Sequence, residues 1–299
     1  MSTIAADVVR QLRERTGAGM MECKKALVET SGDLDAAAEL MRKQGLAKAD
    51  KKAARVAAEG RVVVETAADG HSAAIAEVNC ETDFVAREAD FSSFATAVAQ
   101  VALMVRPDTL ESLLASRLAT GETVDERRRT LVAKVGENIS VRRSATLASQ
   151  GPMGAYLHGT RIGVLVSLEG GDAALARDIA MHIAASNPSY LGAADVPAEV
   201  VAKERAIRVD MLKNDEKNKS KPENILVKIV EGGMNKWLGE ITLVGQPFVK
   251  DPDQTVGKLL EAHKAKVSNF VRFEVGAGIE KKKEDFAAEV MAQVKASSS

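Results

Sequence analysis

The sequence of 299 residues contains few aromatic residues and few cysteines. Aromatics make up only 3%, and proteins that bind single-stranded nucleic acid stack bases on such rings. The two cysteines, Cys23 and Cys80, form no CxxC pattern, which argues against a secreted disulfide framework and favours a reducing compartment. The sequence also lacks an apolar run that could span a bilayer, and its N-terminus is unlike a signal peptide. We therefore expect a cytoplasmic location and no membrane partner.

The charges nearly cancel, because 41 basic and 42 acidic residues leave a net charge of −1. Such a balance provides no extended positive field for a polyphosphate, so we expect no direct nucleic-acid partner. An RNA- or ribosome-associated module that uses the basic stretches 42–55 and 127–143 stays open as an alternative, although such runs are more often solvated faces of helices.

No familiar catalytic or metal-binding pattern occurs in the sequence. The four histidines, His71, His158, His182 and His263, form no HxxxH pair, and none lies near a cysteine, so no zinc site is predicted. The patterns GxxxxGK[ST], GxGxxG and GxSxG are also absent. We expect a binding protein that is not an enzyme and has no cofactor. A small-molecule enzyme with a site assembled between two core units remains the third hypothesis.

Residues 1–45 have the apolar spacing of three short helices. Gly17 interrupts the first pattern, Gly32 ends the second, and Asp33 is suited to cap the third helix. Residues 46–59 are rich in Ala and Lys without a wide apolar face, which indicates a solvated helical linker. Because three short helices have only a thin core, we expect this unit to dock onto another body.

Within this unit the segment Arg15–Leu27, RTGAGMMECKKAL, is distinctive. Met20 and Met21 follow a glycine turn, and flexible thioethers suit a contact surface. Lys24 beside them could meet an acidic helix. Composition alone favours the alternative, in which one methionine packs in the small core and the lysines lie on a solvated face. Both interpretations stay open from the residues themselves.

From Gly60 onward the apolar period changes to that of strands. Two β-branched runs joined by Ala-Asp-Gly predict a hairpin, and a helix and a further strand follow. The same order then recurs, so we predict two copies of one α+β unit with antiparallel sheets. The predicted strands are 61–66, 72–78 and 138–147, then 151–157, 161–168 and 269–275; the predicted helices are 173–185 and one with Phe91, Phe94, Val98, Val101 and Val105 inward.

The second copy is interrupted by residues 197–236, which carry two helical patterns around the charged loop NDEKNKSK. Pro197 and Pro222 stand where helices could start, so an antiparallel helical hairpin is predicted. The tail 276–299 has the pattern of a terminal helix.

The segment Asn79–Val85, NCETDFV, lies where a strand is predicted to end and a helix to begin. Thr82 or Asp83 could cap that helix. Phe84 would then lie in its first turn, either packed inward on the face of Phe91 or exposed as a rigid ring beside a carboxylate. An exposed aromatic ring is an efficient anchor in a partner's pocket, so this segment is a candidate wedge.

The segments RTGAGMMECKKAL and EVNCETDFVA resemble the two signature stretches of the bacterial elongation factor Ts family. The stretches HGTRIGVLVSL, MHIAAS, VEGGMNKWLGEITLVGQPFV and FVRFEVGAGIEK are also similar to that family, in the expected order and over nearly the whole chain. The sequence departs from the family at Gly233 and Trp237 and in the stretches 106–130 and 214–221.

The resemblance implies a layout of five parts along the chain. They are an N-terminal three-helix, UBA-like docking domain (1–54), a first core subdomain (55–148), a second core subdomain (149–190 and 238–275), an inserted helical hairpin of the dimerisation type (191–237) and a C-terminal helical module (276–299).

The resemblance also implies a function, which is guanine nucleotide exchange on the translational GTPase elongation factor Tu. The family binds this partner in its GDP-bound and nucleotide-free states, displaces Mg²⁺ and promotes GDP release during translation elongation. The residues that correspond to the Mg²⁺-dislocating loop are Thr82, Asp83, Phe84 and Val85. Those expected to bind the partner are Arg13, Met20, Met21, Lys24, His158 and Met234. The hairpin 191–237 is expected to support self-association.

Overall fold

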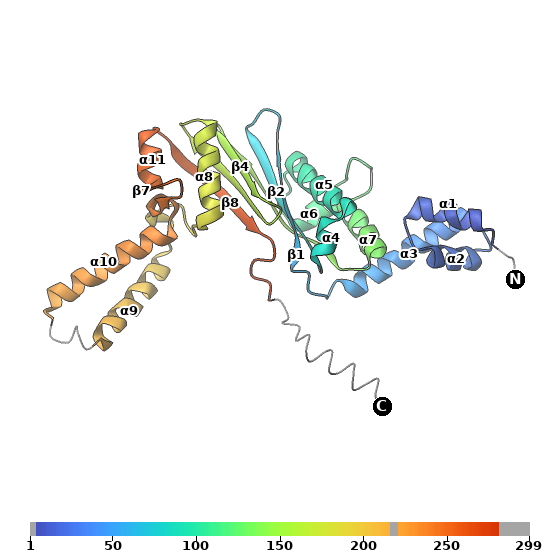
Figure 1. The fold of residues 1–299 in the computed structure, drawn as a ribbon, viewed down its shortest axis with the longest axis horizontal. Helices are drawn as coiled ribbons and strands as arrows, with labels where there is room; N and C mark the ends of the chain where they lie inside the picture. Colours follow the sequence, from blue (N-terminus) through green and yellow to red (C-terminus); the bar gives the residue numbers. More distant parts are fainter. Residues whose placement is uncertain (1–3, 216–220, 281–299) are drawn as a thin grey trace.

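The computed structural model describes residues 4–215 and 221–280. A helical unit at the N-terminus, a central pair of sheets and a helical hairpin follow one another along its long axis (Figure 1). The predicted α+β class with antiparallel sheets is confirmed. The predicted tail helix lies, from residue 281 on, outside the described residues. Within the described ranges no helix is both long and apolar enough to cross a membrane.

Three helices form the N-terminal unit, as the sequence predicted: α1 (Ala6–Thr16), α2 (Met20–Glu29) and α3 (Leu34–Lys52). Leu12, Cys23 and Leu27 are fully buried in its small core. Gly17 ends α1 at a φ of 67°, a conformation that costs little for a residue without a Cβ. Asp33 caps α3, because its Oδ1 accepts hydrogen bonds from two backbone N–H groups at 2.9 Å.

Two three-stranded antiparallel sheets form the centre, and each has its second strand in the middle. In both sheets the pairing of the middle strand with the last strand contains a register shift, at Glu77/Val78 in one and at Ser167/Leu168 in the other. This shared irregularity supports the predicted duplication, because a β-bulge is a specific feature. The first sheet consists of β1 (Glu59–Thr66), β2 (Ser72–Cys80) and β3 (Ile139–Ala148), and the second of β4 (Met153–His158), β5 (Ile162–Glu169) and β8 (Lys266–Glu274).

The two sheets pack face to face, and helices cover their outer faces (Figure 1). Along β2, Ala74, Ala76 and Val78 join the core under the first set of helices, whereas Ala73 and Ile75 join the core between the sheets. This alternation follows from the two-residue period of a strand. The main covering helices are α5 (Ala89–Val105), with α6 (Leu110–Ala115) and α7 (Val124–Val135), and α8 (Ala173–Ser186), with α11 (Val256–Ala262).

One inward residue of α5 was predicted wrongly. Phe91, Phe94, Val98 and Val101 are buried, but Val105 is 51% exposed. Val105 is the last residue of the helix and directly precedes the left-handed cap at Arg106, so the apolar face continues past the part of the helix that is covered.

The second copy is interrupted by the predicted hairpin, which consists of α9 (Ala198–Asn214) and α10 (Glu223–Ile241). Pro197 and Pro222 stand at the two N-caps. Short elements flank the hairpin: the 3₁₀ turns η1 (Ala193–Asp195) and η3 (Leu243–Gly245), and the strands β6 (Pro247–Phe248) and β7 (Asp251–Thr255).

A fully buried carboxylate joins the two core copies. Glu77 of β2 accepts hydrogen bonds from Arg142 at 2.9 Å, from Arg143 at 2.6 Å and from the backbone N–H of Gly276 at 2.9 Å. The β-bulge lets two successive arginines of β3 reach one carboxylate. The Arg143 guanidinium also lies 4.3 Å from the centre of the Phe273 ring on β8.

The pKa of Glu77 follows from this arrangement. Burial alone would raise the pKa, but the hydrogen bonds from Gly276 and the two arginines outweigh burial and hold the pKa below its ordinary value of 4.5. Because the folded-state pKa is lowered, the ionised carboxylate stabilises the fold above pH 4.5, and this stabilisation is lost as the pH falls through the folded-state pKa.

We predict that Glu77→Gln lowers the free energy of unfolding by about 2–3 kcal/mol at pH 7, because two arginines lose their ionic partner. Urea unfolding measures this difference, and it should shrink below pH 4.5. Glu261→Gln, on an exposed glutamate, serves as the control. A difference between wild type and Glu77→Gln that stays constant down to pH 3 would contradict this account.

Candidate protein-interaction site

The segment that follows β2 forms a short helix, α4 (Asp83–Arg87). Of the two capping candidates, Thr82 is the N-cap, and its hydroxyl accepts a hydrogen bond from the Val85 N–H at 3.4 Å. Val85 and Ala86 are buried, with 5% and 9% of their surface exposed, so they fix α4 to the core. Helix α4 contacts β1, β2 and α5, and Figure 1 shows it at the end of the core from which α3 leads to the N-terminal unit.

Phe84 projects into solvent with 77% of its surface exposed. The inward alternative assumed that Phe84 and the buried Phe91 share one helix face. They do not, because Glu88 is extended, at φ −65° and ψ 143°, and separates α4 from α5. Because the two residues belong to different helices, their seven-residue spacing does not put them on one helix face. The exposed arrangement is the one observed.

Asp83 places a carboxylate beside the exposed ring. Its Oδ2 accepts a hydrogen bond from Arg87 at 2.7 Å, four residues further along α4. The Arg87 side chain is exposed and that of Asp83 is about half exposed, so the pair contributes little to stability. The arrangement combines a rigid apolar ring and a charged group on one exposed edge.

A distant turn holds the start of α4 in place. Glu137, between α7 and β3, accepts hydrogen bonds from the Thr82 N–H at 3.0 Å and from the Thr82 hydroxyl at 2.7 Å. In the opposite direction, Glu81 accepts a hydrogen bond from the Asn138 N–H at 2.5 Å. Sequence reasoning missed Glu137 because it lies 55 residues from Thr82 and belongs to no local pattern.

Cys80 contributes a further contact to the same loop. Its Sγ donates a hydrogen bond to the Thr82 carbonyl oxygen at 3.1 Å. Burial, followed by the negative charges of Glu137 and Glu59, raises the pKa of the Cys80 thiol to about 12. The thiol is therefore protonated at neutral pH and has a structural role.

The expected docking residues of the N-terminal unit lie on its surface. Met20 and Met21 are 44% and 76% exposed, and Lys24 is also exposed. The alternative with one methionine in the core is wrong, because Cys23 and Leu27 of α2 fill that core instead. Val28 of the same helix is 59% exposed and enlarges the apolar surface. Sequence reasoning did not single it out.

The remaining expected contact residues differ in their accessibility. Arg13 is exposed on α1. His158 is exposed at the end of β4, where its Nδ1 lies 3.2 Å from the Tyr156 hydroxyl oxygen. Met234 on α10 is only 2% exposed, so its side chain packs inside the protein and presents no surface to a partner. We therefore drop Met234 as a direct contact.

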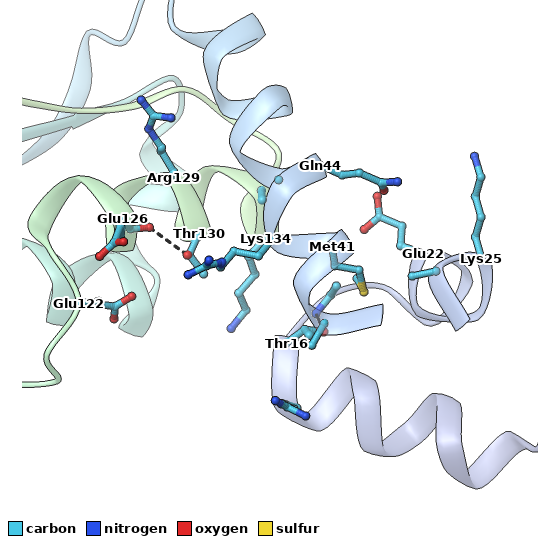
Figure 2. A pocket seen from close by; sticks show the side chains of 17 residues that line it. Thr16, Glu22, Lys25, Met41, Gln44, Glu122, Glu126, Arg129, Thr130 and Lys134 are labelled. Carbon is cyan, nitrogen blue, oxygen red and sulfur yellow. Dashed lines mark hydrogen bonds between the residues drawn. The ribbon is translucent and has the colours of Figure 1, made fainter. Parts of the chain in front are cut away.

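A cleft of about 590 Å³ lies between the N-terminal unit and α7. Figure 2 shows side chains of α7, including Glu126, Arg129 and Lys134, on one side and Thr16 and Met41 on the other. Several charged groups here already have structural partners. Glu126 accepts a hydrogen bond from the Thr123 N–H, and Lys134 forms an ion pair with Asp90.

The two alternative hypotheses receive no support from the geometry. The space between the core copies is filled by apolar side chains such as Val62, Leu165 and Phe273, where the third hypothesis needed a catalytic pocket. In the basic stretch 127–143, several arginines are held in ion pairs with Glu122, Asp125 or Glu77. Among the described residues, no group of three potential ligands could hold a metal ion.

The sequence is similar to known proteins over nearly its whole length. A sequence model of the family described as Elongation factor TS matches residues 81–277. The chain is 62% identical to Elongation factor Ts of Methylococcus capsulatus over 296 residues, which cover 99% of this chain and 100% of that protein. It is 58% identical to Elongation factor Ts of Alkalilimnicola ehrlichii over 295 residues, covering 98% of this chain and 99% of that protein.

These similarities place the chain in the class of translation elongation factors. Within that class the chain belongs to the elongation factor Ts family, because the family model covers more than half of its residues and the relatives cover almost all of them. The resemblance inferred from the sequence motifs is thereby confirmed.

We predict that neither cysteine of the native protein reacts with a disulfide thiol reagent at pH 8 within minutes, because both are buried and the pKa of Cys80 is raised to about 12. Unfolding in guanidinium should expose both thiols to rapid labelling. Peptide mass spectrometry distinguishes the two sites, and fast labelling of Cys80 in the native protein would contradict its assigned environment.

Proposed function

We propose that this protein is a guanine nucleotide exchange factor that binds elongation factor Tu, displaces its Mg²⁺ and promotes GDP release. The family assignment supports elongation factor Tu as the partner. The observation that best supports the mechanism is the exposed Phe84 on helix α4, which is fixed to the core. The proposed place of action is the cytoplasm, where translation elongation occurs.

Exchange is a matter of differential binding. A GTPase holds its nucleotide through backbone amides around the phosphates and through a bridging Mg²⁺. A partner accelerates release only if it binds the nucleotide-free state more tightly than the nucleotide-bound state. The coupling is reciprocal, so an incoming nucleotide weakens the exchange factor by the same factor and expels it.

Thr82, Asp83, Phe84 and Val85 have distinct roles in this proposal. Phe84 inserts between elements near the metal of the GTPase, because it is the exposed apolar group of the loop. Asp83 disturbs the hydrogen bonds or waters that hold the metal. Direct coordination by Asp83 would add a ligand and favour metal retention, and its pairing with Arg87 also opposes coordination. Thr82 and Val85 fix the loop to the core.

Docking and assembly use other surfaces. Arg13, Met20, Met21 and Lys24 bind a helix of the GTPase, and His158 provides a contact from the second core copy. Self-association through the α9–α10 hairpin is also part of the proposal, because the hairpin exposes several large apolar side chains. These are Ile207, Met211, Ile225, Val227 and Ile229.

We predict that Phe84→Ala lowers the catalysed rate of GDP release about thirtyfold, equivalent to ~2 kcal/mol, because the variant loses the wedge. Stopped-flow release of a fluorescent GDP from elongation factor Tu measures this rate. Stability should change by no more than about 0.5 kcal/mol, because the ring is mostly exposed.

Met104→Ala is the matched control for Phe84→Ala, because Met104 is a large apolar residue of similar exposure, 73%, outside the proposed site. It should leave the release rate unchanged. If Phe84→Ala catalysed GDP release at the wild-type rate, the ring would have no part in the mechanism.

We predict that Arg13→Ala combined with Lys24→Ala weakens binding to elongation factor Tu about tenfold at low salt, because two exposed cationic contacts are lost. The difference should shrink as salt screens the charges. Calorimetry at two ionic strengths measures both effects, with Lys258→Ala plus Lys266→Ala as a charge-matched control on an exposed surface elsewhere. Wild-type affinity of the Arg13 and Lys24 variant would refute the docking assignment.

A further inference from the structure

A three-residue turn, Gly136–Asn138, joins α7 to β3 and contacts two other parts of the chain. On one side lies the loop that starts α4, and on the other lies the segment that leaves α3. Gly136 ends α7 in the left-handed conformation, at a φ of 87°. The chain can therefore leave the helix without either of these two contacts.

Glu137 determines which way the Thr82 hydroxyl points. Because the carboxylate can only accept, the hydroxyl donates its proton to Glu137 Oε1, at 2.7 Å. The hydroxyl lone pairs are then available to the Val85 N–H, which is the capping bond of α4. The second carboxylate oxygen accepts from the Thr82 N–H at 3.0 Å. Glu137 therefore fixes both the backbone and the side chain of the residue on which α4 depends.

The same turn fixes the exit of the N-terminal unit. The Lys52 ammonium donates to the Gly136 carbonyl oxygen at 2.5 Å. The buried Asn138 amide donates to the Ala53 and Arg55 carbonyl oxygens, at 3.3 and 2.7 Å. The turn thus holds the start of α4 and the end of α3 in one hydrogen-bonded unit.

We propose that Glu137 is a positioning residue that acts through Phe84: it holds α4 so that the ring meets the partner in a fixed orientation. This inference rests on the proposed exchange function. A five-residue helix has little stability of its own, so its position must be imposed by neighbouring groups. An exposed ring that is held in place before binding loses less conformational freedom on docking than a mobile ring does.

A merely structural role for Glu137 makes a different prediction. If Glu137 only stabilised the fold, its loss would act independently of Phe84, and the effects of the two substitutions on GDP release would multiply. If Glu137 acts through the ring, its loss has no consequence once the ring is absent. A double-mutant cycle separates these cases.

The experiment measures catalysed GDP release by stopped flow for Glu137→Gln, Phe84→Ala and the double variant. We expect Glu137→Gln to slow release about tenfold, because the amide cannot accept both hydrogen bonds. In the Phe84→Ala background the same substitution should change the rate less than about twofold. Amide hydrogen exchange of the peptide covering 81–87 should be faster in Glu137→Gln.

Glu126→Gln is the matched control, because this carboxylate also accepts a backbone N–H bond, from Thr123 at 2.9 Å, at the other end of α7. It should leave release unchanged. Glu137→Asp, which keeps the charge but shortens the reach, should lose activity like Glu137→Gln and provides a second variant if the first fails to fold.

Two outcomes overturn the role of Glu137 while leaving the proposed function intact. One is an impaired Phe84→Ala together with a normal Glu137→Gln or Glu137→Asp. The other is that Glu137→Gln lowers the rate of GDP release by the same factor in the wild-type and in the Phe84→Ala background. If Phe84→Ala itself releases GDP normally, the proposed wedge is wrong, and the positioning role is lost with it.

Discussion

The packing of the two sheets against each other is the constraint on which the other features depend. Strand β2 is buried along its whole length, because helices cover one face and the second sheet covers the other. Small residues permit this close approach. At Gly163, a Cβ would lie 2.5 Å from a Val62 methyl carbon and 2.9 Å from Ile75 Cδ1. A strand held on both faces cannot shift easily, so its end at Cys80 is a fixed point.

The loop after Cys80 starts from this fixed point and is itself held by several contacts. The Cys80 thiol and the Glu137 carboxylate both form hydrogen bonds with the backbone of this loop. The buried side chains of Val85 and Ala86 attach α4 to the core. The exposed Phe84 costs the folded state little, because the ring meets water in the unfolded chain as well. The free energy of burying its apolar surface is thus available for association with a partner.

Local patterns predicted the fold well, whereas contacts between distant residues had to come from the structure. Apolar periods predicted the strands and the main helices, because each is a property of neighbouring residues. The same reasoning left the position of Phe84 open, and the break of the helix at Glu88 decides it. It was wrong in favouring a core position for a methionine of α2, because Cys23 takes that position. Glu137 was not predictable, because its role depends on a turn 55 residues away from Thr82. The family motifs supplied the candidate residues, but the burial of Met234 required coordinates.

The two surfaces of the proposed exchange site differ in a way that suits different tasks. Met20 and Met21 are flexible, and a flexible surface can adapt to both states of a partner, so it adds affinity without distinguishing them. Exchange requires the opposite, a contact whose free energy differs between the nucleotide-bound and nucleotide-free states. In the proposed mechanism, Thr82 and Glu137 hold the backbone of α4, so Phe84 is presented in one orientation that fits one arrangement of the partner and clashes with the other. In the proposed mechanism, rigidity at α4 is the source of discrimination, and the methionine surface supplies affinity.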